Sequence, residues 1–222
     1  MDNLFLHACC APCSIFPLKD ILTKSPKLSL YLWYYNPNIH PKAEYLRRRD
    51  TLAYLISDLS YIAEAAKGDS LREAVKGDFA AAAKGDSLRE AAKEDIAAAA
   101  LVQKPDVTLK ASPYEPAPFL EKAASFKDPK ERCEFCYTLR IGQAASKALS
   151  MGFKYFSTTL LFSRQQDHEL IRKICRQKAC YYGLEFLDED WRLGHSQALS
   201  ISKKLNIYRQ NYCGCVWGDA GM

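Results

Sequence analysis

Residues 4–14 read LFLHACCAPCS, and this stretch decides the fold that we expect. Its opening letters, LFLHA, form a short apolar run that predicts a buried strand ending in a functional loop. Cys9, Cys10 and Cys13 follow directly, and Ser14 is placed to cap the helix that comes next. In open α/β sheets, sites form beyond the carboxyl ends of strands, so these cysteines stand where a site is expected.

The rest of the chain alternates between strand-like and helix-like segments. Further strands are expected at residues 28–35, 107–110, 153–162 and 184–187, and helices at residues 42–59, 119–127, 137–149, 167–182 and 196–205. Such alternation predicts an α/β fold with a doubly wound, mainly parallel, Rossmann-like sheet. A Cys-rich metal site is then expected at the carboxyl ends of its strands.

A helical insertion at residues 63–104 interrupts what we otherwise expect to be a single catalytic domain over residues 1–222. Within it, AAKGDSLREAVKGDFAA at 65–81 is followed by AAKGDSLREAAKEDIAA at 82–98. Each copy holds a Ser-x-x-Glu capping box, which predicts two short Ala-rich helices. A tolerated surface insertion explains this segment most simply. The alternative is an RNA contact made by its lysines, Lys67, Lys76, Lys84 and Lys93.

Composition narrows the class of protein. The chain has 222 residues, 48% of them apolar, a net charge of +5 and nine cysteines. The charge permits a polyanionic partner such as RNA without requiring one. The first residues lack the positive region of a secretory signal, and no apolar stretch reaches the length of a membrane span. We therefore expect a soluble cytoplasmic protein, in which many cysteines indicate metal binding or redox chemistry.

Two further cysteine clusters follow the first. In Cys133-Glu-Phe-Cys136, the spacing lets both sulfurs face one metal or iron–sulfur core. In Cys213-Gly-Cys215, the glycine allows a sharp bend that can split the sulfurs between neighbouring sites. A lone Cys-x-x-Cys is also compatible with a thiol redox pair or half a zinc site, and a Cys-Cys pair with simple burial.

The conjunction of the three clusters favours metal binding over free core thiols. Seven thiols exceed the four of a structural zinc site, which points to a cluster with a second metal beside it. These are Cys9, Cys10, Cys13, Cys133, Cys136, Cys213 and Cys215. Cys175 and Cys180 lie five positions apart on an expected helix, face different directions, and are expected to be ordinary packing residues.

Histidine and arginine give a smaller set of candidates. His40 follows Asn-Pro-Asn in a loop after the second strand and is the best site candidate among the histidines. His7, inside a strand, is expected to be a satisfied core residue, and His168 and His195, at helix starts, to be surface or capping groups. The arginines at 47–49 suit either phosphate contact or a solvated helical face, and we favour the solvated face.

Taken together, HACCAPCS, YNPNIHPKAEYLRR, ERCEFCYTLR, FSTTLLFS and IYRQNYCGC resemble the motifs of the cobalamin-independent epoxyqueuosine reductases. The resemblance covers nearly the whole chain outside residues 63–104, where the repeat departs from the family pattern. It implies the last step of queuosine synthesis in tRNA, in which an epoxide oxygen is removed from the modified wobble base.

The resemblance also implies a 4Fe-4S cluster with an adjacent iron ion. Guided by it, we assign Cys10, Cys133, Cys136 and Cys213 to the cluster. Cys9, Cys13 and Cys215 then hold the single iron and are catalytic residues. Which member of each close pair, Cys9/Cys10 and Cys213/Cys215, serves which centre stays open.

Other residues of the site follow with less support. His40, Arg48 and Tyr212 are the candidate substrate residues. The sequence does not identify the proton donor, a role in which Tyr212, His40 or a bound water could serve. The electron donor is a cytosolic reductant that the sequence does not identify. Two alternatives remain: a thiol–disulfide reductase that uses Cys133 and Cys136, and a zinc-stabilised RNA-binding protein.

Overall fold

The computed structural model describes residues 1–59 and 106–218 of the chain. The insertion expected at residues 63–104, with its repeat, its lysines and its two capping boxes, lies outside the described residues. The strands and helices on either side of it are described, and they contain all nine cysteines.

Five parallel strands form one sheet in the order β3-β2-β1-β4-β5. The strands are β1 (Asn3–His7), β2 (Ser29–Tyr34), β3 (Val107–Ala111), β4 (Tyr155–Thr158) and β5 (Glu185–Phe186). The chain moves from β1 outward to β3 and then returns to the other side of β1, so the strand order reverses between β1 and β4. That reversal confirms the doubly wound sheet, and ligand sites of such sheets form beyond the carboxyl ends of the strands on either side of it, here β1 and β4.

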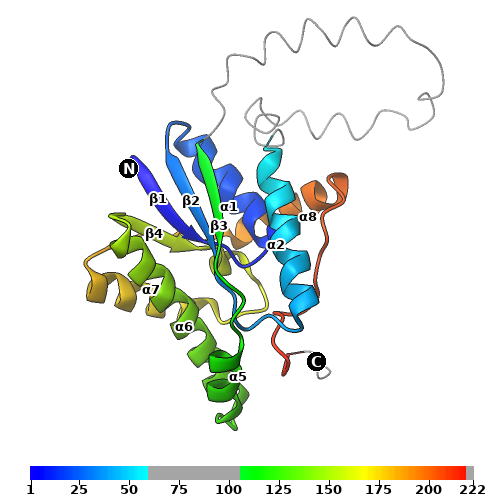
Figure 1. The fold of residues 1–222 in the computed structure, drawn as a ribbon. Helices are drawn as coiled ribbons and strands as arrows, with labels where there is room; N and C mark the ends of the chain where they lie inside the picture. The colour runs from blue at the N-terminus through cyan, green and yellow to red at the C-terminus, as the bar shows by residue number, and fades with distance from the viewer. Residues whose placement is uncertain (60–105, 219–222) are drawn as a thin grey trace, which may run out of the picture.

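Six α-helices and two short 3-10 helices are described. They are α1 (Ala11–Lys24), α2 (Lys42–Ser57), α5 (Ala117–Ala124), α6 (Pro129–Ser150), η3 (Thr159–Phe162), α7 (His168–Tyr182), η4 (Trp191–Gly194) and α8 (His195–Lys204). Figure 1 shows α1, α2 and α8 on one side of the sheet and α6 and α7 on the other. This division follows from right-handed crossovers that proceed in opposite directions from β1.

The central strand is covered on both faces. Leu4, Phe5 and Leu6 of β1 have no exposed surface, because helices pack against each side of the sheet. A parallel strand buried on both faces is expected to be continuously apolar rather than alternating, which is what the run LFLHA shows. The loop after β1 is thereby fixed to the most rigid part of the fold.

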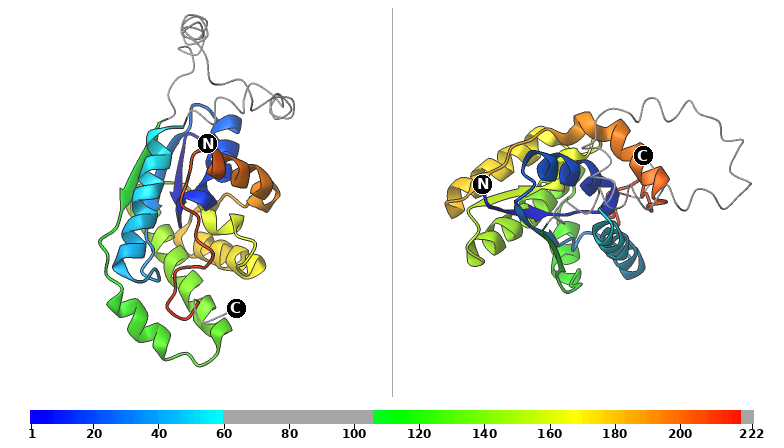
Figure 2. Two further views of the ribbon diagram at one scale, coloured as in Figure 1. Left: turned by 90° about the vertical axis from the view of Figure 1, so that its right-hand side faces the viewer. Right: turned by 90° about the horizontal axis from the view of Figure 1, so that it is seen from above.

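After α8 the chain has no further helix or strand within the described residues. Figure 2 shows this C-terminal segment running along the molecule toward the end where α5 and α6 meet. We call residues 205–218 the tail. It carries Cys213 and Cys215 to the carboxyl end of the sheet.

Ser14 was expected to cap the first helix, and this is wrong. The helix begins at Ala11, with Cys10 as its N-cap in an extended conformation and a proline in its first turn. Ser14 lies inside the helix, where its hydroxyl donates to the Cys10 carbonyl oxygen at 2.8 Å. The cysteine loop is therefore shorter and more tightly joined to α1 than the sequence suggested.

Two other boundaries differ from expectation. The Cys-x-x-Cys does not separate two helices, because Asp128 caps the backbone N–H of Lys130 at 2.8 Å and α6 runs on through both cysteines. The strand expected at residues 153–162 ends at Thr158, whose hydroxyl accepts from the N–H of Leu160 and starts η3. Both differences come from caps made by single side chains.

In the described part of the chain, none of the helices has the length and apolar content needed to cross a membrane.

Candidate metal centre

The first three cysteines form a close group at the end of the central strand. The sulfur atoms of Cys9, Cys10 and Cys13 all lie within 4.8 Å of one another, and the first two are 3.7 Å apart. Among the described residues, this is the one set of three or more potential ligands that are so close together. It lies at the reversal of strand order, where the sequence predicted a site.

Side chains from distant segments orient this group. The Cys9 backbone N–H donates to the Thr159 hydroxyl oxygen at 3.0 Å, and the Thr159 hydroxyl lies 3.3 Å from the Cys9 sulfur. Gln210 of the tail places its Nε2 2.7 Å from the Cys10 sulfur. Thr159 and Gln210 were not among the predicted site residues, although they lie inside the motifs FSTTLLFS and IYRQNYCGC, respectively.

Cys133 and Cys136 lie in the first part of α6. At three positions apart on a helix their side chains share one face, which is the requirement for joint binding of one core. Cys136 is buried and Cys133 is exposed. Removal from water, partial for Cys133 and complete for Cys136, is the main cause that raises the pKa of each thiol.

The tail brings Cys213 to these helix thiols. Cys213 acts electrostatically on Cys133 and on Cys136, and its own thiol is hydrogen-bonded with that of Cys215. This hydrogen bond is the main reason that the pKa of Cys213 falls to about 6. We call Cys133, Cys136, Cys213 and Cys215 the second thiol group, and Cys9, Cys10 and Cys13 the first.

The backbone of the tail is held in place by the loop between β2 and α2 and by α2 itself. The Cys213 carbonyl oxygen accepts from Arg48 Nη1 at 3.1 Å and from Asn38 Nδ2 at 3.3 Å. The Gly214 carbonyl accepts from the His40 N–H at 2.8 Å. Gly214 has a φ of +99°, which a residue with a Cβ rarely adopts, and it packs directly against Arg48.

Aromatic side chains of the tail stack under cations of two helices. The guanidinium of Arg47 lies 3.5 Å from the Tyr208 ring centroid, and the Tyr208 hydroxyl donates to the Glu44 carboxylate at 3.1 Å. Farther along, the Arg132 guanidinium of α6 lies 4.7 Å from the Trp217 ring centroid. The tail therefore contacts both α2 and α6, the helix that carries Cys133 and Cys136.

The three predicted substrate residues gather around the same stretch of tail. His40 Nδ1 lies 2.7 Å from the Tyr114 hydroxyl, and the Tyr212 hydroxyl donates to the His40 carbonyl at 3.4 Å. The Arg48 guanidinium lies 4.9 Å from the Tyr212 ring centroid. Arg48 is buried, so the solvated face that we expected for residues 47–49 is wrong for this residue.

One buried arginine was missed altogether. Arg140 lies one helical turn after Cys136 and interacts electrostatically with Cys136, Cys9 and Cys213. Its charge therefore acts on both thiol groups. The signal was present in the sequence, because Cys-x-x-Cys-x-x-x-Arg places the arginine on the face of the helix that carries the second cysteine.

The remaining histidines lie outside the thiol groups. His7 is a satisfied core residue as predicted, with its ring nitrogens 2.8 Å from the Thr158 hydroxyl and 3.0 Å from the Tyr35 carbonyl oxygen. Burial, followed by the charge of Arg140, lowers its pKa to about 4. His195 is half-buried, stacks on Phe162 and begins α8.

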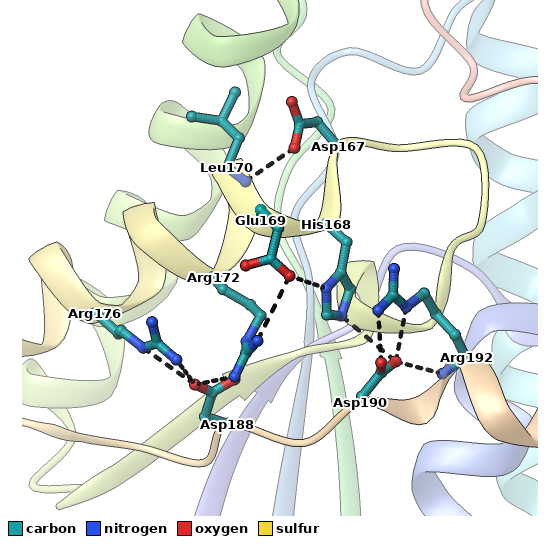
Figure 3. Close-up of polar contacts among 9 residues, drawn as sticks. All are labelled: Asp167, His168, Glu169, Leu170, Arg172, Arg176, Asp188, Asp190 and Arg192. Carbon is teal, nitrogen blue, oxygen red and sulfur yellow. Dashed lines mark hydrogen bonds and ion pairs between the residues drawn. The ribbon is translucent and has the colours of Figure 1, made fainter.

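His168 was expected at the surface, and this is wrong. It begins α7, but its side chain is buried beneath a polar network in which Nε2 lies 3.6 Å from Asp190 (Figure 3). The cap of α7 is instead Asp167, which accepts from the Leu170 N–H at 3.0 Å. In the same network, the Asp190 carboxylate accepts two hydrogen bonds from the Arg192 guanidinium.

Cys175 and Cys180 have different environments. Cys175 is fully buried in the core, as expected of a packing residue, and burial raises the pKa of its thiol. Cys180 is exposed, so the expectation that it packs is wrong. Their separation on α7 directs one inward and the other to solvent.

Comparison with known proteins identifies similar chains. The family model described as "Epoxyqueuosine reductase QueH" matches residues 4–87 and 82–220, two stretches that overlap within the second copy of the repeat. Similar proteins named epoxyqueuosine reductase QueH occur in several bacteria. That of Acinetobacter baylyi is 30% identical over 97% of this chain and 80% of its own length. Those of Staphylococcus epidermidis (28%, over 97% and 75%) and Dehalococcoides mccartyi (27%, over 98% and 92%) are comparable.

Proposed function

Because the chain belongs to the family of QueH epoxyqueuosine reductases, we propose that it reduces epoxyqueuosine to queuosine in tRNA. One observation of the structure supports the proposal: the sulfurs of Cys9, Cys10 and Cys13 lie within 4.8 Å of one another after the central strand, and the tail that carries Cys213 and Cys215 contacts both Cys10, through Gln210, and α6, through Trp217. A site of this kind suits redox chemistry at a metal centre more than it suits the packing of a core.

The chemistry of the ligand set fits an iron–sulfur centre. Seven thiols exceed what one tetrahedral metal ion takes, and the sulfurs of the first group are close enough to share a centre. The reaction takes up two electrons and two protons, releases the epoxide oxygen as water and leaves a cyclopentene. A 4Fe-4S cluster with an adjacent iron would supply the electrons singly and a Lewis acid for the oxygen.

We keep the division of the thiols that the sequence suggested. Cys10, Cys133, Cys136 and Cys213 would hold the cluster. Cys9, Cys13 and Cys215 would hold the iron. The sulfurs of Cys9 and Cys10 are 3.7 Å apart, a distance compatible with one shared centre and with two adjacent ones, and their division between the centres follows the resemblance. Cys213 and Cys215, one residue apart in the tail, would be divided in the same way.

Protons would reach the site along the tail. The Tyr212 hydroxyl, the His40 imidazole and the Tyr114 hydroxyl lie next to the Cys-Gly-Cys turn. The imidazole can hold a proton at Nδ1, 2.7 Å from the Tyr114 oxygen, and His40 and Tyr212 are therefore our candidate donors. Arg48 acts mainly by holding the tail, since only its Nη2 has no partner among the described residues.

The partner is tRNA, which the net charge of +5 accommodates. Binding of tRNA should weaken as the salt concentration rises, because lysine and arginine side chains that contact phosphates displace the counterions bound to the RNA. The reductant that reloads the centre acts from outside this chain.

Purification without oxygen tests the proposal most directly. The protein should be brown, contain more than four irons per chain with acid-labile sulfide, and remove one oxygen from epoxyqueuosine in tRNA when given a chemical reductant. Mass spectrometry of digested tRNA detects that loss of oxygen. Stoichiometric zinc without sulfide would support a zinc-stabilised RNA-binding protein. A colourless, metal-free chain that reduces disulfides would support a thiol–disulfide reductase using Cys133 and Cys136.

A further inference from the structure

Arg140 is buried between the two thiol groups. Its residue exposure is 2%, and its Nη1 donates to the Asn36 amide oxygen at 3.1 Å. The Nε has no hydrogen-bond partner among the described residues. Cys136 lies four positions before Arg140 on the same face of α6. Asn36, which accepts from Arg140, itself donates from Nδ2 to the carbonyl oxygen of Ala8 at 3.0 Å, directly before Cys9. Arg140 therefore lies between the helix thiols and the loop that carries the first thiol group.

A carboxylate does not balance this charge. Within the described part of the chain, the arginines that form ion pairs with carboxylates are Arg48, Arg49, Arg172, Arg176 and Arg192. Arg140 forms no such ion pair there. Its polar neighbours Asn36 and His7 are neutral. In proteins, burying a charge without a counter-charge costs on the order of several kcal/mol. The anion that offsets this cost must therefore come from the thiols and what they bind.

Arg48 makes the contrast clear. It is as buried as Arg140 and also lies beside the tail, but its Nε is 2.6 Å from the Glu44 carboxylate. Glu44 cancels its charge locally, and its Nη1 is used to hold the Cys213 carbonyl. The two arginines therefore have separate tasks: Arg48 contributes geometry, and Arg140 contributes uncompensated positive charge.

We propose that Arg140 is the fixed counter-ion of the metal–thiolate centre and raises the potential at which that centre accepts an electron. The inference rests on the proposed function. Each thiolate ligand brings one negative charge, and one-electron reduction by an external donor adds another. The net charge around an iron–sulfur cluster is one of the factors that set its reduction potential. A buried cation therefore stabilises the reduced form more than the oxidised form.

The test compares Arg140→Gln with Arg140→Lys, which keeps the charge. Arg176→Gln is the matched control, because it removes an exposed arginine of α7 that pairs with Asp188. Protein purified without oxygen is assayed for iron and sulfide, and its midpoint potential is measured by titration with dithionite and electron paramagnetic resonance. Arg140→Gln should shift the potential to more negative values, Arg140→Lys should shift it less, and the control should leave it unchanged.

A second measurement separates charge from packing. In metal-free protein, Arg140→Gln removes an unbalanced buried charge, so its denaturation midpoint should equal or exceed that of the wild type. Equal destabilisation with and without metal would overturn the inference and indicate a packing role. If Arg140→Gln loses the centre while Arg140→Lys keeps it, the counter-ion role is supported; loss in both variants overturns it.

The outcomes also distinguish this inference from the function on which it rests. A wild-type chain that holds iron and sulfide, together with an Arg140→Gln variant of unchanged potential, contradicts the counter-ion alone. A wild-type chain without iron and sulfide contradicts the proposed centre and the counter-ion with it.

Discussion

The thiols that follow β1 and the thiols of the tail meet at one end of the sheet, yet the fold holds them there by different means. The first group spans the end of the loop after the buried central strand and the first turn of α1, so ordinary strand and helix formation places it. The tail has no helix or strand of its own and depends on side-chain contacts with α2 and α6. One half of the site is therefore built into the core, and the other half can be released by local changes.

The largest expected effects separate the two proposed centres within the first group. Cys10→Ser should remove colour and activity together, because it removes a cluster ligand. Cys9→Ser should keep the cluster spectrum but abolish turnover, because it removes a ligand of the single iron. Both effects are measured by iron content, electron paramagnetic resonance of the reduced protein and product formation. The control is Cys175→Ser, on the buried face of α7.

The same assay on the tail shows whether both halves of the site divide in this way. Cys213→Ser should behave like Cys10→Ser, and Cys215→Ser like Cys9→Ser. A bleached Cys9→Ser with a normal Cys10→Ser would reverse the assignment within that pair. Identical behaviour of all seven cysteine variants would contradict the division into two centres.

Gly214→Ala should release the tail while leaving the first thiol group in place. A Cβ there would lie 2.9 Å from Ile39 Cγ1 and 3.0 Å from Arg48 Nη1, in addition to a left-handed backbone cost of about 1–2 kcal/mol. Iron should be lost although the fold, followed by circular dichroism, persists. Gly152→Ala is the control, because its φ is also positive but no atom lies within 4 Å of the added carbon. Full iron content in the Gly214→Ala variant would show that the tail does not require this turn.

Arg47→Ala should loosen the tail only slightly. Its guanidinium stacks on Tyr208 near the surface, and such contacts are worth about 0.5–1 kcal/mol. We expect faster limited proteolysis of the tail with unchanged iron content. Arg49→Ala, in the same run of arginines but paired with Asp50, should leave the proteolysis rate unchanged. Equal rates in the two variants would mean that the stacking contact does not hold the tail.

The smallest effect is expected in the α7 network of Figure 3, which holds no thiol of either group. Hydrogen bonds from Arg192 lower the pKa of Asp190 to about 2. A lowered carboxyl pKa stabilises the fold above the ordinary pKa, and this stability is lost as the pH falls from about 4 toward 2. Because Asp190 is 40% exposed, solvent screening reduces the contribution to below about 1 kcal/mol.

Urea denaturation measures this contribution as a function of pH. Asp190→Asn should lose it at pH 7 and show a weaker dependence of stability on acid than the wild type, with iron content unaffected. An Asp190→Asn variant that loses iron would show that this network supports the metal centre.

Where the sequence was a good guide, the signal was local. The run LFLHA identified the central strand, and alternation of segments identified the doubly wound sheet, because burial on both faces of a strand needs continuous apolar residues. Boundaries failed where one side chain decided them. Asp128 started α6 before the Cys-x-x-Cys, and the Thr158 hydroxyl ended β4 early, neither of which periodicity records.

The sequence by itself determined the candidate ligands: seven cysteines in three clusters, and a strand–loop–helix unit that places the first of them at a sheet end. Only the tertiary structure decided what surrounds those cysteines. Thr159 and Gln210 come from segments far from the cysteines that they contact, and these contacts depend on distances in space that no spacing along the chain encodes. The physical reason is that burial and charge balance depend on all neighbours of a group. The sequence places Glu44 four positions before Arg48 and Cys136 four positions before Arg140, but only the fold shows that both guanidinium groups are buried.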